Sequence, residues 1–175
     1  PDLWCFGKII GGGLPVGAFG SSREIMSNLA PLGSVYQAGT LSGNPLATAA
    51  GLAVLSQLDQ DAYDRLESIA EVLAQGLRAA FADAGVAASV PRVGPLVGCF
   101  FGDAPSPVDF ATAGESVALG RYPAFFHGML ERGIAFAPGP WEVMFASLAH
   151  SDEDLRRTID AAHHVAADMA RRPTH

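Results

Sequence analysis

Positive charge is scarce in this sequence. Its 175 residues hold eleven lysines and arginines against eighteen aspartates and glutamates, and the formal net charge is −7. A surface that binds nucleic acid needs clustered basic side chains to neutralise phosphates. Because the sequence has no such cluster, we expect no nucleic-acid partner.

Cysteine is nearly absent, and long apolar runs are missing. Cys5 and Cys99 stand in apolar strand-like runs rather than at disulfide or metal spacing, so we expect both to be buried in a protein of the reducing cytosol. No run reaches the roughly 20 apolar residues of a membrane span, and no targeting segment opens the chain. These absences predict a cytoplasmic protein with no membrane partner.

The five histidines lack metal-ligand spacing. His127 and His150 each stand alone among aromatic or apolar neighbours, and the adjacent His163 and His164 point to different faces of a helix. We therefore expect no metal site, and we interpret His127 and His150 as structural residues.

One lysine is present, Lys8, and it lies in the small-residue segment of residues 7–18, GKIIGGGLPVGA. Apolar neighbours desolvate an ammonium group, which favours the neutral amine that forms an imine with a carbonyl carbon. A turn at Gly11 to Gly13, with Lys8 reaching solvent from a strand end, would give the same pattern. Lys8 is a candidate catalytic residue, with both interpretations open.

A second segment, residues 35–47, has the sequence VYQAGTLSGNPLA and precedes an alanine-rich helical pattern. Backbone N–H groups of a glycine-containing loop, together with a threonine hydroxyl, can bind phosphate oxygens. Asn44 followed by Pro45 is typical of a helix start. We expect Asn44 to cap a helix, and we favour Gly39 and Thr40 as phosphate-binding residues.

Together these segments resemble the class III aminotransferases that use pyridoxal phosphate, and within them the aminomutases that act on glutamate 1-semialdehyde. Residues 7–20 and 36–45 match that group nearly unaltered, and the resemblance continues to the end of the chain through residues 125–134, 137–142 and 147–151. It implies an α/β fold of the pyridoxal-phosphate-dependent transferase type (aspartate aminotransferase-like, fold type I). Residues 1–60 would be the C-terminal part of the large cofactor-binding domain, and residues 61–175 the small α+β domain.

The resemblance also implies roles for matching residues. Lys8 matches the lysine that holds the cofactor as an imine and then moves protons as a base. Thr40, with Gly39, matches the contact to the cofactor phosphate of the neighbouring subunit, which implies a homodimer. Glu142 matches a glutamate near the substrate, although residues 139–144, GPWEVM, depart from the group's usual sequence. A loop carboxylate in water is the alternative for Glu142.

The implied reaction moves an amino group within a small amino-aldehyde, glutamate 1-semialdehyde, and gives 5-aminolevulinate for tetrapyrrole (porphyrin) synthesis. Because Pro1 stands only seven residues before Lys8, we expect the chain to be a fragment that is inactive alone. Two other functions stay open. One is a class III aminotransferase that exchanges amino groups between separate molecules, and the other is a truncated, non-catalytic interaction domain.

Hydrophobic periodicity and turn residues predict the elements. We expect strands over residues 3–10, 15–20, 89–94, 97–103, 134–137 and 143–148, helices over 23–29, 45–58, 61–84 and 121–132, and a surface loop over 105–118. Ser151 and Asp154 should cap a final helix. The boundary between two domains should lie near residue 60. Two stripes should be buried, on the 61–84 helix Tyr63, Leu66, Ala70, Leu73, Leu77 and Phe81, and on the final helix Leu155, Ile159, Ala162, Val165 and Met169.

Overall fold

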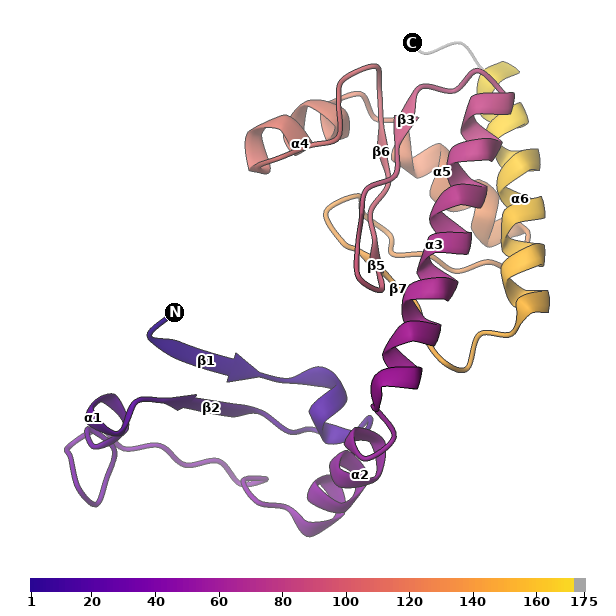
Figure 1. Cartoon of the computed structure of the whole chain (residues 1–175). Coiled ribbons are helices and arrows are strands. Elements are labelled where there is room, and N and C mark those ends of the chain that lie inside the picture. Colours follow the sequence, from indigo (N-terminus) through magenta and orange to yellow (C-terminus); the bar gives the residue numbers. More distant parts are fainter. Residues whose placement is uncertain (172–175) are drawn as a thin grey trace. The chain divides into compact units, whose positions relative to one another are not determined.

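The computed structural model describes residues 1–171, which divide into two compact units, Pro1–Gln60 and the residues from Asp61 onward (Figure 1). The division falls within the polar run of residues 57–61. The roles of the two units as parts of a large and a small domain stay predictions.

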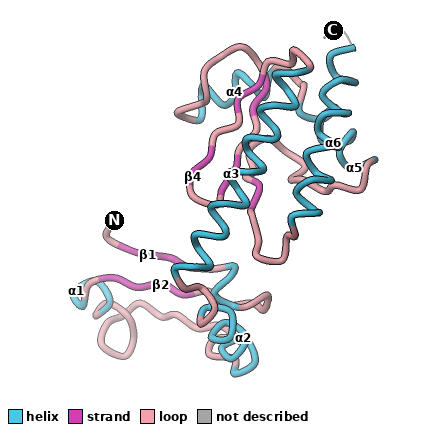
Figure 2. Tube along the Cα trace, turned by 45° about the vertical axis from the view of Figure 1, so that its right-hand side comes forward, coloured by secondary structure: helices cyan, strands magenta, loops and turns pink. Residues whose placement is uncertain are grey.

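The first unit contains a two-stranded antiparallel sheet. Strands β1 (Leu3–Phe6) and β2 (Ala18–Ser21) pair along their whole length. A 3-10 helix, η1 (Lys8–Gly11), follows β1, and a short helix, α1 (Arg23–Met26), follows β2. A long loop then leads to helix α2 (Pro45–Leu55), as Figure 2 shows.

The predicted strand over residues 3–10 is wrong in its second half. Lys8 has a φ of 54°, and the chain turns there into η1. A left-handed residue cannot continue a strand, whose φ is near −120° to −140°. The two predicted helices of this unit are present, but they end earlier than expected, at Met26 and Leu55.

The second unit contains the long helices. They are α3 (Gln60–Asp83), α4 (Phe110–Ala118), α5 (Tyr122–Glu131) and α6 (Asp152–Arg171). In both views α3 and α6 run side by side (Figures 1 and 2). Gly76 permits this close approach, because a Cβ atom at that position would overlap the Ile159 side chain of α6.

The strands of this unit are two residues long, and all their pairings are antiparallel. They are β3 (Ala88–Ser89), β4 (Arg92–Val93), β5 (Leu96–Val97), β6 (Phe100–Phe101) and β7 (Met144–Phe145). β3 pairs with β6, and β5 lies between β4 and β7. The predicted strand pair is thus a hairpin, interrupted where the Gly98 N–H donates to the Pro91 carbonyl at 2.8 Å.

Aromatic rings form the centre of the hydrophobic core in the second unit. Phe81 of α3 lies 5.2 Å from Phe101 and 5.5 Å from Phe125 between ring centroids, and all three side chains are buried. Edge-on contacts of this kind add to the free energy gained by burial. Cys99 lies in the same core, and burial raises the pKa of its thiol to about 12.

Several expectations need correction. Residues 110–118 form α4 rather than a loop, because Asp109 and Thr112 make a reciprocal capping box at its start. Residues 134–137, which the structure describes, form no strand. Tyr63 is 48 % exposed, since α3 begins beyond the edge of the core. Cys5 is exposed on strand β1 of the two-stranded sheet, contrary to the expected burial.

The other members of both stripes are buried or half-buried, as predicted. The predicted cap of α6 is confirmed, because the Ser151 Oγ accepts a hydrogen bond from the Asp154 N–H at 3.1 Å. None of the helices within residues 1–171 has the length and apolar character that a membrane crossing requires. In the same range, no three His, Cys, Asp or Glu side chains come together as metal ligands.

Replacing Phe81 by alanine should destabilise the second unit by about 3–5 kcal/mol, because the change leaves a cavity beside the rings of Phe101 and Phe125. Tyr63→Ala on the same helix is the matched control, and it should cost less than about 1 kcal/mol. Urea unfolding followed by circular dichroism measures both. Equal losses for the two variants would contradict the position of the core.

The α6 cap predicts a pH dependence of stability. The Ser151 hydroxyl and then its N–H donate to the Asp154 carboxylate, at 2.6 and 2.9 Å, and hold the pKa of that carboxyl below its usual value. A lowered folded-state pKa stabilises the fold above the unfolded pKa of about 3.9, and this contribution disappears as the pH falls through the folded-state pKa.

Ser151→Ala should therefore lower the free energy of unfolding most above about pH 5, and the difference from the unmodified chain should shrink below about pH 4. Unfolding curves recorded over this pH range test the expectation. A difference that grows on acidification would rule out the assigned hydrogen bonds as its cause.

Candidate functional site

Lys8 occupies a strained backbone position directly after β1. It is the first residue of η1. Among residues 1–171 it is the only non-glycine residue with a positive φ. Such a conformation costs an L-residue about 1–2 kcal/mol, and it persists where the surrounding structure holds it in place. Strained residues of this kind gather at functional sites, so the observation supports Lys8 as a candidate.

The strained turn is held by direct contact between two backbones. A Cβ atom on Gly51 of α2 would overlap the Ile10 carbonyl oxygen of η1, and a Cβ atom on Gly12 would overlap the Ala50 carbonyl oxygen. Gly51 and Gly11 are also buried. Since only glycine permits this approach at both points, helix α2 supports the segment that carries Lys8.

Lys8 lines an open pocket together with Ile9, Gly13, Leu14, Pro15 and Val16. Apart from the Lys8 amine, this pocket is lined by apolar side chains and backbone, in agreement with the apolar neighbours seen in the sequence. Lys8 is exposed, however, so the residues that the structure describes do not provide the desolvation expected from its apolar neighbours.

The loop before α2 has the predicted helix start. The Asn44 Oδ1 accepts hydrogen bonds from the N–H groups of Leu46 and Ala47, both at 3.1 Å, which confirms the cap. Two turns precede it, because the Ser42 N–H donates to the Gly39 carbonyl at 2.9 Å and the Asn44 N–H donates to Leu41 at 3.1 Å.

Gly39 lines a second pocket, between this loop and the β1–β2 sheet. Thr40 is exposed and does not line it. The described residues of the first unit therefore place Lys8 and Thr40 around no common pocket. A contact from Thr40 to a neighbouring subunit, as the family resemblance implies, remains a prediction.

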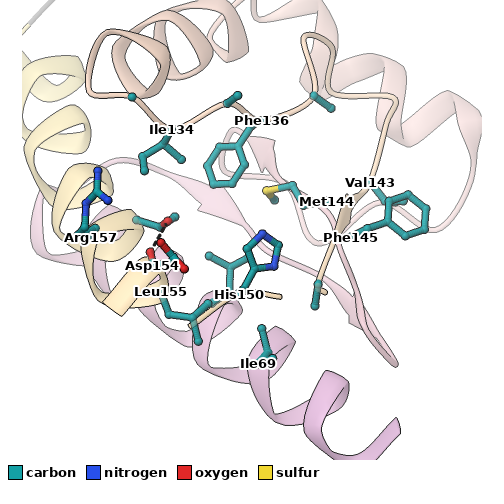
Figure 3. A pocket seen from close by; sticks show the side chains of 16 residues that line it. Ile69, Ile134, Phe136, Val143, Met144, Phe145, His150, Asp154, Leu155 and Arg157 are labelled. Atoms are coloured by element: carbon teal, nitrogen blue, oxygen red, sulfur yellow. Dashed lines mark hydrogen bonds between the residues drawn. The ribbon is translucent and has the colours of Figure 1, made fainter. Parts of the chain in front are cut away.

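Glu142 lies in a tight turn of the second unit. Its N–H donates to the Gly139 carbonyl at 3.2 Å, and its side chain is exposed. The turn leads into Val143 and Met144, which line the pocket drawn in Figure 3. Glu142 itself does not line this pocket.

The walls of that pocket include the apolar side chains of Ile134, Phe136 and Leu155 and the polar groups of His150, Asp154 and Arg157 (Figure 3). The Nδ1 atom of His150 accepts the Ser147 N–H at 3.1 Å. This bond ties the two ends of the 147–150 turn together and supports the prediction that His150 is structural.

Sequence reasoning missed the side chains that surround the Glu142 turn. Trp141 stacks on Phe110 of α4, with ring centroids 4.6 Å apart and planes 17° from parallel. The Tyr122 hydroxyl donates to the Ala137 carbonyl at 2.9 Å. The Asp-x-x-Thr pattern at residues 109–112 was the available signal for α4, but no local signal indicated which ring α4 would present.

Solved transaminases share this architecture. An omega-transaminase from Sphaerobacter thermophilus matches with a TM-score of 0.84 and 30 % identity, over 98 % of this chain and 39 % of that chain. A transaminase solved with PLP bound matches with a TM-score of 0.81 and 25 % identity, over 97 % of this chain and 38 % of that one. The structure has the mixed α/β fold of the class III transaminases, which confirms the predicted fold class.

The sequence places the chain in the corresponding family. The family model Aminotransferase class-III matches residues 1–165. Glutamate-1-semialdehyde 2,1-aminomutase of Desulfosudis oleivorans is 51 % identical over 97 % of this chain, and that of Desulforamulus reducens is 55 % identical over 93 %. The chain belongs to the aminotransferase class-III family. It spans 39 % and 37 % of the lengths of these two relatives.

The contact between η1 and α2 predicts opposite effects for two glycine-to-alanine changes. Gly51→Ala should loosen α2 and speed hydrogen exchange of its amide groups, because the added methyl group meets backbone that cannot move aside. Gly114→Ala in α4 should instead slow exchange there by stabilising the helix by about 0.5–1 kcal/mol. Its Cβ atom would meet only an ordinary contact with Trp141 at 3.8 Å. Slower exchange of α2 in Gly51→Ala would refute the close contact.

Proposed function

We propose that this chain is part of a pyridoxal-phosphate-dependent aminomutase that converts glutamate 1-semialdehyde into 5-aminolevulinate for tetrapyrrole synthesis. The observation that carries the proposal is the identity of 51–55 % to aminomutases, together with a lysine held at a strained turn. The chain spans about two-fifths of those relatives, so the activity is proposed for a full-length protein that contains these residues.

The described residues fit the cofactor in their functional groups and in the open space beside them. Lys8 supplies a primary amine, and the Gly39–Thr40 loop supplies backbone N–H groups and a hydroxyl. A Cβ atom at Gly13 or Gly43 would meet no atom within 4 Å, so the backbone beside both groups is open. Pyridoxal phosphate, when bound, supplies an electron sink for the carbon whose bonds are broken.

Lys8 would have two tasks in this protein. Its Nζ atom would hold the cofactor covalently, and once released it would accept a proton at Nζ and return it to a neighbouring carbon. Leu14 and Val16 line the pocket beside it and would keep water from part of the amine's surroundings. The fixed backbone of η1 limits the directions from which the side chain can reach.

The remaining predicted residues complete the proposal. Gly39 and Thr40 would bind the cofactor phosphate of a neighbouring subunit, which makes a homodimer part of the active site. Glu142 would contact the substrate. The expected compartment is the cytoplasm. The support for these roles is the match of residues 36–45 and of Glu142 to the aminomutase pattern.

A second candidate function is amino transfer between separate molecules. The omega-transaminase with a TM-score of 0.84 to this chain favours it. The two functions differ in their requirement for a separate amino donor. A full-length protein that forms 5-aminolevulinate from glutamate 1-semialdehyde without a donor supports the aminomutase, whereas dependence on a donor supports the alternative.

The role of Lys8 can be tested directly, because it is the only lysine in the 175 residues. After addition of pyridoxal phosphate and reduction with borohydride, peptide mapping should find the label on Lys8. Lys8→Ala should abolish the labelling, whereas Thr40→Val should retain it, since that change replaces a hydroxyl by a methyl group and leaves the Lys8 amine in place. Labelling that persists in Lys8→Ala would disprove the assignment. No labelling of the unmodified chain, together with no product from the full-length protein, would favour a non-catalytic domain.

A further inference from the structure

Two exposed aromatic rings are stacked on each other beside the Glu142 turn. Phe110 is 79 % exposed and Trp141 is 48 % exposed, yet their ring planes lie within 17° of parallel at a centroid distance of 4.6 Å. Neither ring belongs to the buried core. Their contact therefore lies outside the interior of the second unit.

Helix α4 presents a flat platform to Trp141. Phe110 and Gly114 are four residues apart and so lie on one face of the helix. The nearest atom to a Cβ at Gly114 would be the Cη2 atom of Trp141, at 3.8 Å. The indole ring thus lies along α4, over the ring of Phe110 and the bare backbone of Gly114.

Both the platform and the start of the turn are tied to the core. The Ser116 hydroxyl of α4 donates to the Phe101 carbonyl at 2.6 Å. At the start of the turn, the Ala137 carbonyl accepts the hydroxyl of Tyr122, whose side chain is only 5 % exposed. Trp141 thus packs on α4, which the Ser116 hydrogen bond ties to the core, and Ala137 is tied to the core by the Tyr122 hydroxyl.

Glu142 contributes to the raised pKa of the Tyr122 phenol. Burial, and after it the charges of Cys99 and Glu142, raises the pKa of Tyr122 to about 12, so the phenol remains a donor to the Ala137 carbonyl. The segment that leads into the Glu142 turn lies beside the Tyr122 side chain, because the Ala137 carbonyl accepts its hydroxyl.

We infer that the Phe110–Trp141 stack is a positioning device that sets the direction of the Glu142 carboxylate. Phe110 is a positioning residue, because it acts through Trp141 and the turn. The inference rests on the proposed function, in which Glu142 contacts the substrate. It assigns a role in substrate selectivity to α4.

The first test concerns the stack itself and needs no catalysis. Trp4 is the other tryptophan of the chain, so Trp4→Phe leaves Trp141 as the single indole fluorophore. In that background Phe110→Ala should increase acrylamide quenching of Trp141 by about twofold. Phe110→Tyr should retain the original quenching, because it preserves the ring. Val108→Ala is the matched control, since Val108 is also exposed, at 88 %, and carries no ring that could stack on Trp141.

The second test concerns substrate binding in the full-length protein. Phe110→Ala should raise KM for glutamate 1-semialdehyde by about fivefold, with kcat changed by less than about twofold. Phe110→Tyr should restore KM, and Val108→Ala should leave it unchanged. In a Glu142→Gln background, Phe110→Ala should add no further increase in KM, because the two residues act in series.

Unchanged quenching in Phe110→Ala would overturn the inference, and so would an unchanged KM or a rise in KM that persists in full in the Glu142→Gln background. If the unmodified full-length protein forms no 5-aminolevulinate, the proposed function fails, and with it the assignment of substrate selectivity to Phe110. The quenching experiment still decides the separate question of whether the stack holds Trp141.

Discussion

The contact of the η1 backbone with the α2 backbone is the constraint on which the first unit depends. Gly12 and Gly51 lie where any side chain would overlap a carbonyl oxygen of the opposite segment. This unit buries few side chains, and Trp4, Phe6 and Leu52 are exposed. Its local order around Lys8 therefore comes from backbone contact more than from a hydrophobic core. The strained φ of Lys8 is held by that contact.

The second unit is organised by a different interaction, the packing of aromatic rings in a core. Phe125 lies at its centre, with Phe81, Phe101, Tyr122 and Phe136 around it at centroid distances of 5.5 to 5.9 Å. Tyr122 connects this core to the Ala137 carbonyl at the base of the Glu142 turn. The segment before Glu142 is thus tied to buried rings, and a separate contact, the exposed Phe110–Trp141 stack, connects the turn to α4.

Sequence patterns predicted the elements whose signals are local. The 3.6-residue stripe located α3 and α6, and the capping residues Asn44 and Ser151 located the starts of α2 and α6. The pattern failed where a non-local contact decides the backbone. An apolar run predicted a strand through residue 10, but the positive φ of Lys8 ends β1 at Phe6. The capping residues of α4 were present in the sequence, yet the composition of residues 105–118 resembled that of a loop.

By itself the sequence determined the family and the single lysine, and it predicted the residues that would contact a cofactor, because these depend on chemical identity and on spacing along the chain. Only the tertiary structure decided that Lys8 is strained and exposed, that Gly51 supports it, and that Phe110 lies on Trp141. The reason is physical. Backbone overlap and ring stacking depend on distances between segments that are remote in the sequence, and no local pattern encodes those distances.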